Sequence, residues 1–237
     1  MILTERIELD GGLGAFVARP SDDELRGGVV VCHELFGVTM HVREVCERIA
    51  GLRWAAIAPE LYHRVAPAAE LAHDDAGRDR GFGLLRRLTR DGAIADVRAA
   101  VEHLRAAGAP RIALLGLSLG GHVAYLAGTA LDVNLVICAY PGWLAGTEIA
   151  LSQPEPTLTL TPGIRGRVVV LTGSDDHAVP DADREALAAA LQAARVDHEI
   201  VVYPGTPHGF LCDRRDTFLP DQADDAWRRI ERELATI

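Results

Sequence analysis

The chain has 237 residues, of which 49% are hydrophobic, and it carries a formal net charge of −10 at pH 7. A chain of this length can bury a sizeable core, and α/β folds of this size commonly form one domain, so we expect residues 1–237 to be a single domain. The acidic balance argues against nucleic acid as a partner, because a phosphate backbone is bound by patches rich in Lys and Arg.

The N-terminal sequence MILTERIELD has neither the basic start nor the apolar core of a signal peptide. No apolar run approaches the roughly 20 residues that are needed to cross a bilayer. We therefore expect a soluble, cytoplasmic protein with no membrane partner. The four cysteines lie far apart and show no metal-ligand spacing, which fits a reducing compartment and predicts no metal site; they are Cys32, Cys46, Cys138 and Cys212.

The first two segments, ERIEL and GAFVAR, predict an antiparallel hairpin at the edge of a sheet, with its turn at residues 10–12. Six apolar runs rich in β-branched residues follow, and they predict the buried strands of a mostly parallel sheet. These runs are GVVVC (28–32), WAAIA (54–58), RIALL (111–115), NLVICAY (134–140), RVVVLT (167–172) and HEIVVY (198–203).

Helices are predicted between these strands, near residues 39–51, 92–107, 119–129, 181–195 and 221–235. In the second of them, apolar residues recur at spacings of three and four and form one apolar face. Strands that alternate with helices predict a doubly wound α/β sheet. Residues 60–90, which have room for a short helix, and 141–163 interrupt the alternation, and we expect both to overlie the loop end of the sheet.

The heptapeptide GLSLGGH (116–122) follows the RIALL run and fits the pattern G-x-S-x-G around Ser118. In a strand-to-helix turn, flanking glycines leave room for a strained serine, and the free N–H groups of the next helix favour an anion beside it. The alternative is an ordinary turn in which Ser118 caps the helix.

Two further polar segments favour the catalytic interpretation. GSDDH (173–177) follows the RVVVLT run and PGTPHG (204–209) follows the HEIVVY run, so the chain order is Ser, Asp, His, as in α/β-hydrolases. We predict that His208 is the general base for Ser118 and that Asp176 orients it, with Asp175 as the rival. His177 and His122 are weaker candidates, as a loop residue and a helix-face residue.

The segment HELFG (33–37) follows the GVVVC run, where an α/β-hydrolase supplies its second oxyanion donor. We assign the two backbone N–H donors to Leu35 and Leu119. Glu34 then lies close to the nucleophile; the alternative is a surface residue at the entry to a helix.

Five segments together resemble the dienelactone hydrolase family of α/β-hydrolases. They are HELFGVTMHVREVCERIA, APELYHR, GLSLGGH, GSDDHAVP and YPGTPHGF, and the resemblance runs from about residue 28 to the C-terminus. It implies a single-domain α/β-hydrolase with a mostly parallel sheet flanked by helices. It also implies hydrolysis of an ester or lactone through an acyl-enzyme, without a metal or organic cofactor.

The resemblance places Ser118 at the nucleophile, Asp176 and His208 at the acid and base, and Glu34 at the glutamate that contacts the nucleophile. The family usually has cysteine where this chain has Ser118, and there the glutamate helps to form the thiolate. With a serine at this position, we expect Glu34 to orient water or to bind substrate. The family also uses two arginines to bind a substrate carboxylate. One position is matched by Cys212, with Arg214 two residues on, and the other is Arg78 or Arg80.

We therefore predict a serine hydrolase of the dienelactone hydrolase family that acts on a small-molecule ester or lactone. Alternatives are an acyltransferase or thioesterase with the same triad, or a ligand-binding protein on a hydrolase scaffold. The short connections leave little material for a large lid, so a lipase is not expected.

Overall fold

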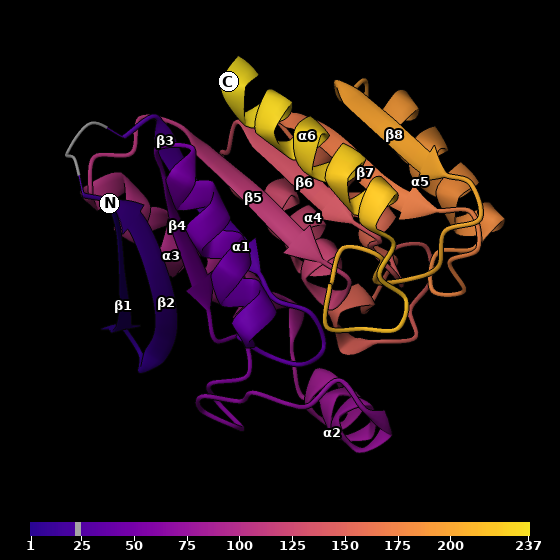
Figure 1. Ribbon diagram of the computed structural model, residues 1–237. Helices are drawn as coiled ribbons and strands as arrows, with labels where there is room; N and C mark the ends of the chain where they lie inside the picture. The colour runs from indigo at the N-terminus through magenta and orange to yellow at the C-terminus, as the bar shows by residue number, and fades with distance from the viewer. Residues whose placement is uncertain (22–24) are drawn as a thin grey trace.

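The computed structural model of the protein describes residues 1–21 and 25–237. One eight-stranded sheet runs through the described residues in the order β1-β2-β4-β3-β5-β6-β7-β8 (Figure 1). Its strands are β1 Ile2–Leu9, β2 Leu13–Pro20, β3 Gly27–Cys32, β4 Trp54–Pro59, β5 Ile112–Leu117, β6 Leu135–Ala139, β7 Arg167–Gly173 and β8 His198–Tyr203.

The hairpin of β1 and β2 is antiparallel, and β2 also pairs with β4 in antiparallel register. From β4 to β8 every neighbouring pair is parallel. Gly11 and Gly12 in the hairpin turn have φ values of +78° and +74°, a left-handed conformation that glycine adopts without steric cost. The predicted edge hairpin and the mostly parallel sheet are both confirmed.

Helices cover both faces of this sheet. Figure 1 shows α1 and α6 on one face and α3, α4 and α5 on the other, and each face has its own cluster of buried apolar side chains. The helices are α1 Met40–Gly51, α2 Asp75–Leu85, α3 Arg90–Ala106, α4 Leu119–Ala130, α5 Asp181–Ala193 and α6 Pro220–Thr236. Among the described helices, none is long and apolar enough to cross a membrane.

One strand differs from the sequence-based expectation of burial. The HEIVVY run forms β8, but most of its side chains are only half-buried and Val202 is 42% exposed. The reason is its position, because β8 is the last strand of the sheet and pairs only with β7. A β-branched run is typical of a strand in either position and does not by itself distinguish an edge from the centre.

The two segments that interrupt the alternation lie beyond the strand ends. Residues 60–90 contain α2, which begins where Asp74 accepts a 2.7 Å hydrogen bond from the N–H of Gly77 and lies below the sheet in Figure 1. The second segment is tied to α4 by the buried His122. Its Nδ1–H donates to the carbonyl of Gly142 and its Nε2 accepts from the hydroxyl of Thr157, both at 2.9 Å.

Candidate active site

Ser118 lies between the end of β5 and the start of α4 in a backbone conformation that is rare for a residue with a side chain. Its φ is 54° and its ψ is −116°. The turn is tight on both sides. A Cβ at Gly116 would lie 1.9 Å from the carbonyl oxygen of Gly120, and a Cβ at Gly120 would lie 1.9 Å from that of Cys32. The glycines of the G-x-S-x-G pattern are therefore required by close backbone approach.

A continuous chain of hydrogen bonds starts at this serine. Ser118 Oγ lies 2.8 Å from Nε2 of His208, and Nδ1 of His208 lies 2.9 Å from both carboxylate oxygens of Asp176. All three side chains are buried, with Asp176 only 2% exposed. In this arrangement the carboxylate holds a proton on Nδ1, which leaves Nε2 free to accept the hydroxyl proton of Ser118.

Sequence spacing could not separate Asp175 from Asp176 as the partner of His208. The structure shows which of the two faces the imidazole. Asp175 is exposed, and its carboxylate accepts a hydrogen bond from the hydroxyl of Ser174 at 2.8 Å. Asp176 points inward to His208 and also accepts from the N–H of Ala178 at 2.9 Å. His177 is exposed, and its ring lies 5.8 Å from that of His208 at the mouth of the same pocket.

The HELFG segment lies against the start of α4 and is anchored by His33. The ring of His33 is fully buried, and this burial lowers its pKa to about 4, so the imidazole is neutral near pH 7. Its Nε2 accepts from the N–H of Leu61 at 3.2 Å, and its Nδ1–H donates to the carbonyl of Glu34 at 2.6 Å. A neutral imidazole offers one donor and one acceptor, and both are used here.

That hydrogen bond bears directly on the predicted oxyanion donor Leu35. The carbonyl of Glu34 and the N–H of Leu35 belong to one planar trans peptide, so holding the first also sets the direction of the second. Leu119, the other predicted donor, is the first residue of α4, where an N–H has no acceptor within its own helix. Leu35 and Leu119 both line the pocket that contains Ser118.

Glu34 is not a surface residue. Its side chain is 3% exposed and lines the Ser118 pocket. Its Oε1 accepts a 3.2 Å hydrogen bond from the hydroxyl of Tyr140, and it lies 4.0 Å from a guanidinium nitrogen of Arg215. Burial raises the pKa of Tyr140 well above its usual value, so this phenol remains a hydrogen-bond donor. The hydrogen bonds of the described residues do not include one between Glu34 and Ser118.

The pocket around Ser118 has a volume of about 290 Å³ and contains two arginines. Arg78 on α2, whose side chain is 55% exposed, is one of the two that the sequence suggested for that position; Arg80 is also exposed and does not line the pocket. The other arginine is Arg215. Arg214, which the sequence favoured, pairs with Glu44 at 2.5 Å outside the pocket.

Sequence reasoning missed Arg215, although it is the direct neighbour of Arg214. Its guanidinium passes over Gly209, where a Cβ would lie 2.2 Å from the Nη1 atom and where φ is +80°. The glycine that follows His208 thus makes room for this guanidinium group. The adjacent pair of arginines was the available signal, but spacing alone does not tell which of the two turns inward.

The remaining pocket walls come from the two segments that interrupt the α/β alternation. Phe82 on α2 and Trp143 in the 141–163 segment contact edge to face, with ring centroids 6.3 Å apart, and both line the pocket. The expectation that both segments overlie the loop end of the sheet is confirmed. A Cβ at Gly81 would lie 2.6 Å from the Leu35 side chain, so α2 packs directly on the oxyanion segment.

Residues 13–237 match the model of the dienelactone hydrolase family. The chain belongs to this family. A Synechocystis protein named "Putative carboxymethylenebutenolidase" is 32% identical over 215 residues, which cover 88% of this chain and 85% of that protein. A protein of the same name from Escherichia coli is 30% identical over 220 residues, which cover 91% of this chain and 79% of that one.

The fold comparison agrees with this membership of the dienelactone hydrolase family. A crystal structure of a protein from Klebsiella pneumoniae, described as a "Putative Dienelactone Hydrolase", superposes with a TM-score of 0.90 and 26% identity over the full length of both chains. The predicted α/β-hydrolase fold is confirmed. The prediction of a carboxylic ester or lactone hydrolase of the dienelactone hydrolase family is confirmed as well.

Proposed function

We propose that this dienelactone hydrolase family member is a single-domain serine hydrolase that cleaves a small, soluble ester or lactone through an acyl-enzyme. The observation that carries the proposal is the hydrogen-bonded chain from Ser118 Oγ through His208 to Asp176. A serine hydroxyl is a weak nucleophile until a neighbouring base takes its proton. In this hydrogen-bonded chain His208 is that base, and Asp176 holds it in the correct tautomer.

In the first half of the reaction, Ser118 Oγ attacks the substrate carbonyl carbon and its proton passes to Nε2 of His208. Asp176 stabilises the imidazolium that forms. The carbonyl oxygen becomes an oxyanion, which accepts hydrogen bonds from the N–H groups of Leu35 and Leu119. When the carbon–oxygen bond to the leaving group breaks, His208 returns the proton to the departing alcohol, and the acyl group remains on Ser118.

In the second half, water takes the place of the leaving group. His208 accepts a proton from the water as its oxygen attacks the acyl carbon, and then returns a proton to Ser118 Oγ as the acid leaves. For a lactone, the alcohol and the acid are two ends of one product. The pocket of about 290 Å³ accommodates a small substrate rather than a long acyl chain.

The charges in the pocket favour a substrate that carries a carboxylate. Arg78 and Arg215 both line it, whereas Glu34 is already engaged with Tyr140 and lies beside Arg215. Guanidinium groups bind carboxylates in pairs of parallel hydrogen bonds, which also fixes the substrate's orientation. Such a substrate would agree with the name carboxymethylenebutenolidase that the related proteins carry.

The test combines a fluorophosphonate probe with a panel of small aryl esters and lactones. The wild-type protein should be labelled once and should turn over members of the panel, and Ser118→Ala should remove both properties while circular dichroism shows an unchanged fold. Ser174→Ala is the matched control, because this serine is exposed on a neighbouring loop and should leave labelling intact. Turnover by Ser118→Ala within about tenfold of wild type would contradict the proposal, since loss of a triad member costs several orders of magnitude.

A further inference from the structure

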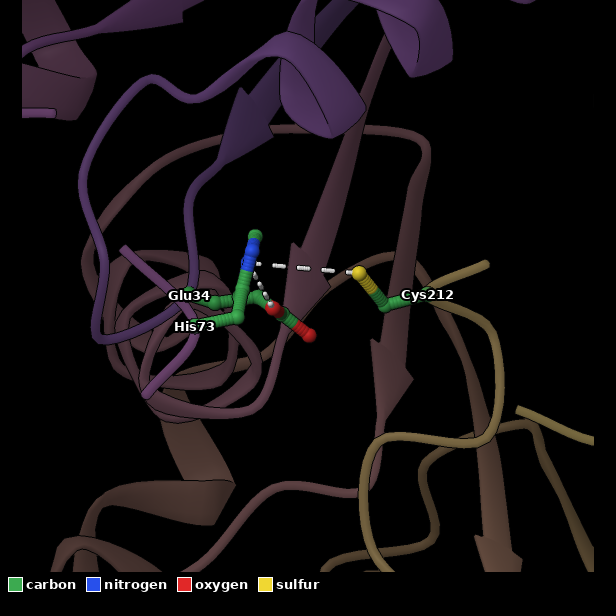
Figure 2. Close-up of side chains that lie close together, drawn as sticks. All are labelled: Glu34, His73 and Cys212. Atoms are coloured by element: carbon green, nitrogen blue, oxygen red, sulfur yellow. Dashed lines mark hydrogen bonds and ion pairs between the residues drawn. The ribbon is translucent and has the colours of Figure 1, made fainter. Parts of the chain in front are cut away.

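Glu34, His73 and Cys212 come from three distant parts of the chain and point toward one another (Figure 2). Nε2 of His73 lies 4.0 Å from Oε2 of Glu34 and 4.0 Å from Sγ of Cys212. The first separation is too long for a hydrogen bond between nitrogen and oxygen. Three lone-pair donors therefore converge on one point without strong direct contacts between them.

We propose that Glu34, His73 and Cys212 bind one zinc ion. Carboxylate oxygen, imidazole nitrogen and thiolate sulfur are the three ligand types that proteins offer to zinc, and three protein ligands leave a fourth position for water. From the usual metal–ligand bond lengths, a tetrahedral site has neighbouring ligand atoms about 3.3 to 3.6 Å apart. Each of the two distances from His73 must therefore contract by roughly half an ångström, which side-chain torsions can supply.

The neighbouring side chains orient Glu34 and His73 toward the proposed zinc position. Tyr140 and Arg215 both approach Oε1 of Glu34, which leaves Oε2 directed at His73. The ring of Phe36 lies 4.5 Å from the His73 ring and limits its rotation.

The charge balance is also compatible with a dication at this position. Burial raises the pKa of the Cys212 thiol to about 12, so the thiol holds its proton in the metal-free protein. On binding, the Zn–S bond forms and this proton leaves to solvent. A zinc ion with one thiolate and one carboxylate forms a unit of zero net charge beside Arg215, whereas a thiol that kept its proton would leave this unit with a net charge of +1.

An ion can reach the cluster from solvent. His73 is partly exposed, and it lines a surface cavity of about 240 Å³ whose charged residues are three carboxylates and three guanidinium groups, those of Asp74, Asp75, Asp216, Arg78, Arg214 and Arg215.

The experiment is a zinc titration of the purified, metal-stripped protein under a thiol-free reductant, in competition with a chromogenic zinc indicator. The wild type should bind one equivalent. Cys212→Ser and His73→Gln should each weaken binding by more than about 100-fold, because removing outer partners alone costs 10- to 100-fold. With Co²⁺ as the probe, the wild type should show a thiolate-to-cobalt charge-transfer band that Cys212→Ser lacks.

Asp213→Asn is the matched control. Asp213 and His41 form a second group around the same Cys212, so this control tests which of the two groups holds the ion. The proposal is overturned if the wild type binds no zinc at a stoichiometric level, if His73→Gln binds as well as wild type, or if Asp213→Asn abolishes binding. Ser118, Asp176 and His208 are not ligands, so these outcomes leave the proposed hydrolase mechanism standing.

Discussion

Nδ1 of His33 donates a 2.6 Å hydrogen bond to the carbonyl of Glu34, and this carbonyl shares its peptide plane with the N–H of Leu35. His33 is thus a positioning residue. It sets the direction of the Leu35 N–H, which is the proposed oxyanion donor, and supplies no such donor of its own.

Replacing His33 should therefore lower turnover more than it affects substrate binding. His33→Phe keeps an aromatic ring but removes both hydrogen bonds, and we expect kcat to fall about 10- to 100-fold, less than the ~10²- to 10³-fold loss on removing a donor outright. His33→Gln, which offers one donor and one acceptor, should recover part of the loss. Steady-state kinetics on folded variants provide the measurement, and an unchanged kcat in His33→Phe would show that the peptide is held by other contacts.

The two adjacent aspartates should respond differently to the same substitution. Asp176→Asn favours the wrong tautomer of His208 and should lower kcat by about 10⁴-fold, as in other triads. Asp175→Asn alters an exposed carboxylate that bonds only within its own loop and should cost far less. Measuring kcat for Asp176→Asn and Asp175→Asn tests this difference. Comparable losses in the two variants would indicate that the reaction depends on the conformation of the loop and not on the Asp176 carboxylate.

The neighbouring arginines offer a second matched pair. Arg215→Gln removes a cation from the Ser118 pocket and should raise KM about tenfold or more for an ester that bears a carboxylate, since a charged hydrogen bond contributes about 1.5–3 kcal/mol. A neutral ester of the same size should be affected much less. Arg214→Gln breaks ion pairs with Glu44 and Asp213 outside the Ser118 pocket and should leave both KM values near wild type. Equal effects of Arg215→Gln on the two esters would exclude a role in recognising the substrate's charge.

Glu34 should matter less with a serine nucleophile than with a cysteine. Its carboxylate is held by Tyr140 and lies beside Arg215, and no thiolate has to be generated at Ser118. We expect Glu34→Gln to lower kcat by less than about 100-fold in the serine protein, well short of the loss on removing a triad member. In Ser118→Cys, the same substitution should cost much more. The double-mutant cycle measures this coupling, and a loss in Glu34→Gln as large as that in Ser118→Ala would give the carboxylate an essential role in the serine reaction.

The two neutral, buried histidines should make folding sensitive to mild acid. Burial lowers the pKa of His122 from 6.5 to about 4, and that of His33 by a similar amount. Between these pH values the unfolded chain binds a proton that the folded chain does not, so stability falls as pH falls through this window. The slope is at most about 1.4 kcal/mol per pH unit for each histidine.

Chemical denaturation of wild type and His122→Gln across this range checks the expectation. The variant should be less stable near pH 8, because it loses contacts with Gly142 and Thr157, but its stability should decline less steeply toward pH 5. Parallel declines in the two proteins would mean that His122 does not contribute to the acid sensitivity.

Local chemistry determined most of what the sequence revealed about this protein. Apolar β-branched runs and helical spacing depend on neighbours a few residues away, so the strands, the helices and the turn around Ser118 were predictable from short segments. The order of Ser118, Asp176 and His208, each beyond a predicted strand, predicted that the three side chains meet, because parallel strands end at the same edge of the sheet.

Only the tertiary structure decided which side chains turn inward. Asp176 rather than Asp175, and Arg215 rather than Arg214, face the pocket because of loop torsions that adjacent positions do not reveal. Glu34 is buried among Tyr140, His73 and Arg215, which come from three other parts of the chain. His73 and Cys212 are 139 residues apart in sequence, and their contact follows from how two loops meet at the end of a sheet. The number of residues between His73 and Cys212 in the sequence does not predict this contact, because the contact depends on the packing of every element between them.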